Sequence, residues 1–244
     1  MNFQTFIGEK AIEKEQQRLG REHWPEFMQH DAIVEKHWAS LYSDFLAFQS
    51  AAYSEDRIAG VGNSVPIRFE DKINSLPNGG LDWAMEKAVD DRTHGRIPNM
   101  LVGVQILINP ALRNTGLSYT FLDLMKQAAA AKGIKQVALP VRPTFKHLYP
   151  LIPMDEYMKW LNSKGEPFDP WIRVHLKAGG RLVSVCSESM TIRGSIADWQ
   201  KWTGLTFQSS GIYNVEHALS PVKIDLDKNT GEYIEPNVWI VHKS

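Results

Sequence analysis

Residues 113–118 combine an arginine, a glycine and hydroxyl side chains, which are groups that bind anions. Arg113 offers a permanent positive charge with several N–H donors, and Gly116 lets the backbone approach a ligand without a side chain in between. Ser118 is able to cap a helix or hydrogen-bond a ligand. The first N–H groups of a helix lack partners within it and carry partial positive charge. This segment therefore indicates a phosphate-binding turn, with ordinary helix capping as the alternative.

The residues on either side of the turn predict the elements that would position it. The apolar run 100–108 is typical of a buried strand, and Pro110 ends it because proline cannot extend a strand ladder. From Leu117 onward apolar residues recur at helical spacing, and Gly133 favours a helix end. Residues 136–141 are predicted to form the next strand. The turn would then lie at the N-terminus of the helix.

Residues 105–118, QILINPALRNTGLS, resemble the acyl-CoA pyrophosphate loop of the GNAT superfamily of N-acetyltransferases. The family pattern is arginine or glutamine, two residues, glycine, one residue, then glycine or alanine. Arg113 and Gly116 fit this pattern and Ser118 departs from it. The resemblance implies that this segment binds the diphosphate of a coenzyme A thioester. The residues it assigns to ligand binding are Ile106, Leu107, Ile108, Arg113, Asn114, Thr115, Gly116, Leu117 and Ser118.

The order of the preceding strands agrees with this resemblance. Residues 45–53 and 57–69 read as two strands joined by a short polar turn. The resemblance implies an α/β GNAT fold, in which a mixed, mostly antiparallel sheet is flanked by helices. It also implies that strands 100–108 and 136–141 splay apart around the pantetheine arm. A helix over residues 145–160 would pack near the acyl end.

The downstream half carries less common strings, DPWIRVH at 169–175 and EPNVW at 235–239. They resemble the GNAT-like domains of polyketide synthase loading modules and free-standing relatives of those domains. In such domains a threonine after the second core strand and a histidine ending the DPW segment are associated with decarboxylation of a malonyl thioester. Thr144 and His175 occupy the matching positions and are the catalytic candidates.

Decarboxylation of a malonyl thioester leaves an enolate. The site then needs a donor for the oxyanion, a proton source and a dry pocket. The imidazole of His175 exchanges a proton near neutral pH, and the Thr144 hydroxyl is able to orient the carboxylate or the thioester oxygen. A hydrogen-bonded core histidine is the alternative interpretation of His175.

Amine acetylation has a different requirement, because the substrate ammonium must lose a proton before it attacks the thioester. Glu70, Asp71 and Tyr149 are candidates, but none has diagnostic spacing. We predict an acyl-CoA-dependent acyltransferase, with a malonyl-thioester decarboxylase and a non-catalytic acyl-CoA-binding or carrier-docking module as alternatives. The bound substrate would be acetyl-CoA or malonyl-CoA. Further partners would be an acyl carrier protein or a small amine acceptor.

Composition narrows the class of protein. The 244 residues are 43% hydrophobic and 23% charged, ordinary values for a globular chain with a sizeable core. A net charge of −1 gives no electrostatic case for nucleic acid. The apolar runs are too short for a bilayer span and no signal peptide is evident, which predicts a cytoplasmic protein without a membrane partner. Cys186 is the only cysteine and the histidines lack ligand spacing, so no metal site is expected.

We expect a single acyl-CoA-binding domain in three parts. These are a helical N-terminal segment at 1–40, a core at 41–185 and a β-rich extension at 186–244. Pro25 interrupts the helical pattern of the first part. Glycines at 179–180 predict a hairpin turn between strands 171–176 and 181–186. Trp199 and Trp202 would share one face of a helix.

Overall fold

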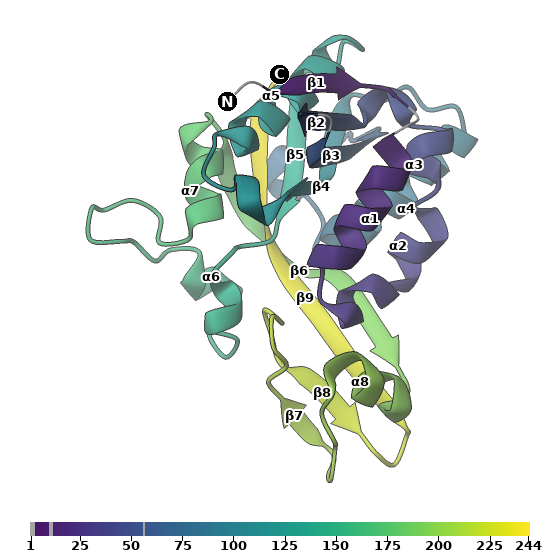
Figure 1. Ribbon diagram of the computed structural model, residues 1–244, viewed down its shortest axis with the longest axis vertical. Helices are drawn as coiled ribbons and strands as arrows, with labels where there is room; N and C mark the ends of the chain where they lie inside the picture. The colour runs from purple at the N-terminus through teal and green to yellow at the C-terminus, as the bar shows by residue number, and fades with distance from the viewer. Residues whose placement is uncertain (1–2, 10–11, 56) are drawn as a thin grey trace.

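The computed structural model describes residues 3–9, 12–55 and 57–244, which form a nine-stranded sheet flanked by helices (Figure 1). The strand order is β1-β2-β3-β4-β5-β9-β8-β7, and β6 pairs with β9 off that path. The strands are β1 (Gln4–Ile7), β2 (Ser50–Ser54), β3 (Arg57–Ile67), β4 (Met100–Ile108), β5 (Gln136–Val141), β6 (Arg181–Gly194), β7 (Gly211–Tyr213), β8 (Val222–Asp225) and β9 (Thr230–Lys243). The helices are α1 (Ile12–His23), α2 (Ala32–His37), α3 (Ser40–Ser43), α4 (Gly80–Thr93), α5 (Leu117–Ala130), α6 (Met154–Tyr157), α7 (Pro170–Lys177) and α8 (Ile196–Thr203).

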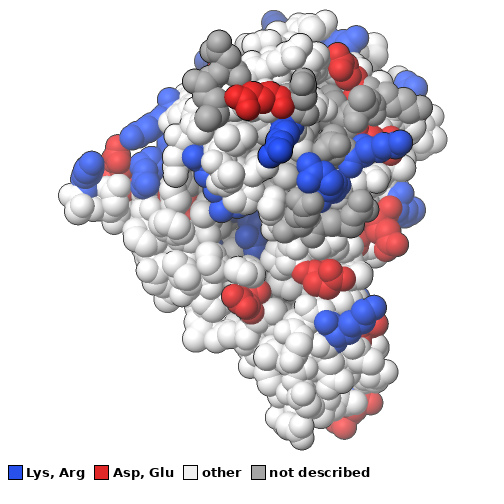
Figure 2. Space-filling view, in the orientation of Figure 1, with Lys and Arg blue, Asp and Glu red and all other residues white. Residues whose placement is uncertain are grey.

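Helices cover both faces of the sheet, as predicted. On one face α5 and α7 bury apolar side chains that include Leu122, Met125 and Ile172. On the other face α1 and α4 pack through residues such as Leu19 and Met85. Burial of this kind supplies most of the driving force for folding. Among the described residues, none of the helices has both the length and the apolar composition needed to span a bilayer. Figure 2 shows acidic and basic side chains interspersed over one side of the molecule.

Strands β4 and β5 diverge from one another. They are parallel and pair only at Leu101 with Val137 and at Val102 with Ala138. The register between β3 and β4 also shifts, because Ser64 pairs with Gly103 and Asn63 pairs with Gln105. Val104 is thus an extra residue on β4, a β-bulge that bends the strand. The predicted splaying is confirmed, and the wedge between the two strands opens toward their C-terminal ends.

The central elements match the predictions from the pattern of apolar residues. Strands β4 and β5 and helix α5 begin where they were expected, and β2 and β3 form the expected hairpin. The N-terminal segment departs from the prediction at its start, where Gln4–Ile7 form strand β1 against β2. The rest of the segment is helical and is interrupted at Pro25, where a 3-10 turn over Glu26–His30 follows α1. Trp199 and Trp202 lie on α8, with ring centroids 5.3 Å apart. These elements were predictable because local periodicity alone specifies them.

The prediction of a strand at 171–176 is wrong, because these residues lie in helix α7. Oδ1 of Asp169 accepts hydrogen bonds from the backbone N–H groups of Trp171 and Ile172. Pro170 occupies the first helical turn, where its missing N–H has no cost. The expected hairpin turn is instead the end of this helix, with Gly179 in a left-handed conformation. An aspartate cap followed by proline outweighs the β-branched residues in this segment.

Two further element predictions are wrong in extent. The helix expected over 145–160 is limited to a 3-10 turn at Lys146–Leu148 and the short α6. Pro150 and Pro153 lie between these pieces and disfavour helix at the residues before them. The strand expected over 45–53 begins only at Ser50, after a 3-10 turn at Leu46–Phe48.

A buried carboxyl pair joins α2 to α4 and β6. Asp31 caps α2 and accepts hydrogen bonds from the N–H groups of Ile33 and Val34. Asp82, in the first turn of α4, accepts a hydrogen bond from the N–H of Thr191 at 3.0 Å. The two carboxyl groups contact each other. Burial raises the pKa of Asp82 most, the negative charge of Asp31 raises it further, and the resulting pKa is about 8. Asp82 is therefore protonated at neutral pH in the folded state.

This pair is expected to make stability fall as the pH rises. Between about pH 4 and about pH 8 the folded chain holds a proton on Asp82 that the unfolded chain releases, so the free energy of unfolding declines across this window and levels off above it. The side chain introduced in Asp82→Asn cannot ionise. In this variant the fall in the free energy of unfolding across this pH window should therefore be smaller by roughly 1–3 kcal/mol. Urea unfolding across this pH range measures the effect. The exposed Asp71→Asn is the control, and an unchanged slope in Asp82→Asn would contradict the assignment.

Candidate functional site

The turn between β4 and α5 presents consecutive N–H groups without partners. Asn114 (φ 64°) and Gly116 (φ 90°) both lie in the left-handed region, and no side chain caps α5. The N–H groups of residues 114–118 make no hydrogen bond within the described chain, while those of Tyr119 and Thr120 both donate to the carbonyl of Gly116. Such a row of free donors at a helix N-terminus is suited to an anionic oxygen cluster.

The space and the charge around the turn also suit an anionic ligand. A Cβ atom placed on Gly116 would have no other atom within 4 Å, so the turn is open on that side. The Arg113 side chain is exposed and makes no ion pair with the described residues. Ile106, Leu107 and Ile108 form the end of β4 that leads into the turn. The sequence-predicted binding residues are thus contiguous in space as well as in sequence.

The wedge leads into this turn. Pairing between β4 and β5 stops after Val102, so the side of β4 that faces β5 has no strand partner from Val104 to Ile108. Unpaired strand edges readily hydrogen-bond amide groups of a ligand. A ligand with a diphosphate at one end and an amide-containing arm therefore finds matching groups along the turn and the wedge.

An ion pair between a half-buried arginine and a buried glutamate lies just beyond the C-terminal end of β5. Arg142, directly after β5, donates from Nε to Oε2 of Glu235 on β9 at 2.9 Å. Glu235 is fully buried and also accepts from the hydroxyl of Tyr233 at 2.9 Å. Arg142 Nη2 donates to the carbonyl of His217 at 2.6 Å. This network ties the C-terminal extension to β5 and was not predicted, because its members are far apart in the chain.

Lys146 is a buried cation in the same region. Its Nζ donates to the carbonyls of Tyr149 at 2.8 Å and Leu219 at 2.6 Å. Burial lowers the pKa of Lys146 to about 8. No carboxylate of the described residues pairs with it, so the two carbonyls are what hold its ammonium group in place.

His175 lies inside the protein. Its side chain is fully buried on α7, and its Nδ1 is 2.9 Å from Nε2 of His242 on β9. Burial lowers the pKa of His175 well below its ordinary value and that of His242 to about 4. Both rings are therefore neutral at physiological pH. Nε2 of His175 has no hydrogen-bond partner within the described chain.

Thr144 is exposed on the loop after β5, and its carbonyl lies 2.9 Å from Nδ1 of His147. No hydrogen bond within the described chain joins its hydroxyl to His175. The structure thus places the two catalytic candidates in different environments, one at the surface and one in the core. Their roles stay a prediction.

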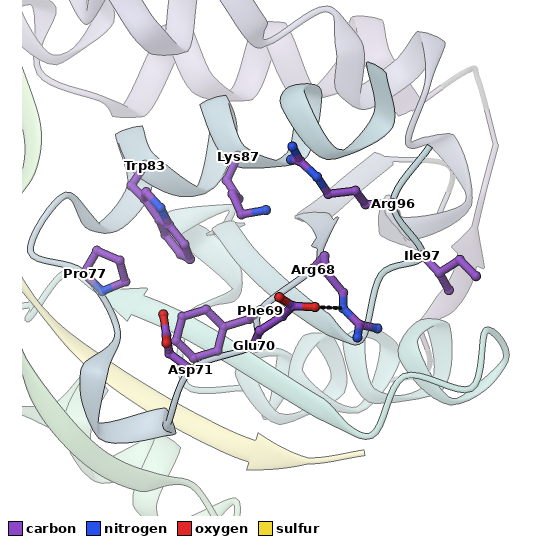
Figure 3. Close-up of a pocket in the computed structure, with 9 residues that line it drawn as sticks. All are labelled: Arg68, Phe69, Glu70, Asp71, Pro77, Trp83, Lys87, Arg96 and Ile97. Atoms are coloured by element: carbon purple, nitrogen blue, oxygen red, sulfur yellow. Dashed lines mark hydrogen bonds and ion pairs between the residues drawn. The ribbon is translucent and has the colours of Figure 1, made fainter. Parts of the chain in front are cut away.

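The candidates for amine deprotonation lie elsewhere. Glu70 and Asp71 line a pocket of about 720 Å³ with Trp83 and Lys87, shown in Figure 3. This pocket lies where β3 ends and β4 begins, so the length of β4 separates it from the phosphate-binding turn. Tyr149 packs against Trp160, with ring centroids 4.9 Å apart. In the part of the chain that the structure describes, no three His, Cys, Asp or Glu side chains form a group suited to a metal ion.

Comparison with solved structures identifies the fold of this protein. The chain matches the loading GNATL domain of CurA from Lyngbya majuscula over 100% of its own length and 98% of that chain, at a TM-score of 0.66 and 18% identity. It matches the GphF GNAT-like decarboxylase, solved with isobutyryl-CoA, over 100% and 99% of the chains, at a TM-score of 0.57 and 15% identity. The protein therefore has the GNAT fold, and the predicted resemblance to GNAT-like domains is confirmed.

Sequence comparison adds a curated relative. Arginine N-acetyltransferase avaD of Aspergillus versicolor is 29% identical over 247 residues, which cover 90% of this chain and 84% of that protein. An aminoglycoside 6'-N-acetyltransferase complexed with coenzyme A is a further structural match, with a TM-score of 0.50, 11% identity and coverage of 100% and 97%. No model of a known protein family matches the chain.

Proposed function

We propose that this protein is an acyl-CoA-dependent acyltransferase that transfers an acetyl group to a nitrogen atom of arginine or of an arginine derivative. The observation that carries the proposal is the row of unpartnered N–H groups at residues 114–118, placed at the end of a wedge between two splayed strands. The 29% identity of the protein to an arginine N-acetyltransferase supports arginine or an arginine derivative as the acceptor.

The chain's own groups have defined parts in this reaction. The N–H groups of residues 114–118 and the Arg113 side chain bind the diphosphate of acetyl-CoA. The unpaired edge of β4 hydrogen-bonds the pantetheine amides and aligns the thioester with the open end of the wedge. The acceptor nitrogen attacks the thioester carbon, the C–N bond forms, and the C–S bond breaks to release the CoA thiolate, which takes up a proton.

The second candidate is decarboxylation of a malonyl thioester. It is favoured by the likeness in fold to the GphF GNAT-like decarboxylase and by the motif that contains His175. In this reaction the C–C bond to the carboxylate breaks, carbon dioxide leaves, and the resulting enolate takes up a proton. His175 would supply the proton and Thr144 would orient the carboxylate or the thioester oxygen. The partner would then be free malonyl-CoA or a malonyl group on a carrier protein.

One experiment separates these functions. The purified protein is incubated with acetyl-CoA or malonyl-CoA, each with and without arginine, arginine-containing dipeptides and simple amines. Transfer predicts release of free thiol and an acetylated product only when an acceptor is present. Decarboxylation predicts carbon dioxide from malonyl-CoA without any acceptor and a sharp fall in His175→Ala. Binding of acetyl-CoA with neither product would contradict both activities and leave an acyl-CoA-binding module.

A further inference from the structure

Two histidines, His147 half-buried and His217 exposed, meet beyond the C-terminal end of β5, the end toward which the wedge opens. His147 lies on the loop that follows β5, and His217 lies in the extension between α8 and β8. Their ring centroids are 5.7 Å apart. Nothing in their sequence spacing indicates this meeting, because it depends on how the extension folds back onto the loop.

The hydrogen bond of His147 specifies which ring nitrogen is basic. Its Nδ1 lies 2.9 Å from the carbonyl oxygen of Thr144. Because a carbonyl oxygen only accepts, Nδ1 carries the proton in the neutral ring, and Nε2 keeps its lone pair. The same contact fixes the orientation of the ring. His147 is thus preset to take a proton at Nε2.

The backbone of His217 is held in an uncommon conformation. Its φ is 66°, a left-handed value that is strained for a non-glycine residue. Its carbonyl is held by Arg142, which the buried Glu235 anchors in turn. Nε2 of His217 lies 3.6 Å from a carboxylate oxygen of Glu216. Several contacts therefore maintain the position of this ring opposite His147.

The other titratable groups near the wedge are unsuited to proton removal. His175 is fully buried, and Glu235 is buried and occupied by Arg142 and Tyr233. Lys146 is buried against two carbonyls. Among the groups next to the two histidines, Arg142 and Lys146 are cations held by other partners, and the exposed Glu216 is paired with His217.

We propose that His147 is the general base for acyl transfer, with His217 as the residue that positions it. Nε2 of His147 removes the proton from the attacking acceptor nitrogen as the C–N bond forms and the C–S bond of the thioester breaks. The inference rests on the proposed function, because it requires a nitrogen nucleophile. It supplies the deprotonating group for which the sequence shows no spacing pattern.

The test compares His147→Gln with the wild-type protein in the acetylation assay with arginine. We expect kcat/KM to fall roughly 100-fold, the usual contribution of a general base, and the rise of the rate with pH through the neutral range to disappear. Added imidazole should restore part of the activity of His147→Ala. His217→Ala should show a smaller loss and keep the rise with pH. Binding of acetyl-CoA, measured as a shift in melting temperature, should be unchanged in all three.

His94→Gln is the matched control, because Nδ1 of His94 also lies 2.9 Å from a carbonyl, that of Asp90, but at the far end of the sheet. It should retain wild-type activity and pH dependence. If wild-type protein acetylates arginine and His147→Gln does so at the same rate with the same pH profile, the assignment of the base is overturned and the proposed function stands. If wild-type protein binds acetyl-CoA and acetylates no acceptor, both are overturned.

Discussion

Gly116→Val is expected to weaken binding of acetyl-CoA by roughly 100-fold, which corresponds to nearly 3 kcal/mol. At φ 90° a β-branched side chain is strained, so the turn would leave its left-handed conformation and its N–H groups would no longer converge. The new side chain would also occupy the open space beside the turn. Isothermal titration with acetyl-CoA measures the loss directly.

The matched control is Gly133→Val at the opposite end of α5. Gly133 has a φ of 71° and equally open surroundings, so the backbone strain is similar and the distance from the turn is the difference. Both variants should lose similar stability, while only Gly116→Val should lose affinity. Equal affinity in the two variants would show that residues 114–118 do not bind the ligand.

Asp169→Ala is expected to lower the free energy of unfolding by about 4 kcal/mol, the largest stability effect that we anticipate from a single side chain. Its carboxylate is buried and accepts four hydrogen bonds. The donors are the N–H groups of Trp171, Ile172 and Phe145 and the hydroxyl of Tyr157. Removing the carboxylate leaves these donors unpaired, three of them backbone groups that cannot move away.

Urea denaturation provides the measurement, with Asp198→Ala as the control. Asp198 also serves a helix start, in the capping box with Ser195 on α8, but this site is exposed. Its loss should cost much less stability than the loss of Asp169, since water replaces the missing acceptor. Asp169→Asn should be intermediate because its amide oxygen still accepts. A similar effect of both alanine variants would contradict the role of the buried carboxylate.

Local patterns predicted the part of the fold that surrounds the turn. The apolar run of β4 and the helical spacing in α5 are each contained within one element, so no tertiary information is needed to interpret them. The α7 segment misled the prediction because Ile172 and Val174 alternate as in a strand, while Asp169 and Pro170 form a helix start. In so short a segment, helix caps and prolines predict the secondary structure better than β-branched residues do.

The dependence on local patterns also explains which residues of the site were predicted. Residues 113–118 are consecutive, so their pattern is visible in the sequence. Arg142 and Glu235 are 93 positions apart, and nothing in either neighbourhood indicates the other. His147 and His217 meet only because the extension returns to the loop after β5. Residues that only tertiary contacts bring together could not be predicted from the sequence, and they are the residues that lie beyond the C-terminal end of β5.

The length of β9 has a consequence for any attempt to shorten this protein. Its first three residues, Thr230 to Glu232, pair with β8 of the extension, and its last six, Val238 to Lys243, pair with β5. Excising the hairpin of β7 and β8 would leave a row of unsatisfied backbone groups along one side of β9. Unpaired strand edges of this kind pair with strands of other protein chains. A trimmed protein would therefore tend to aggregate before any activity could be measured.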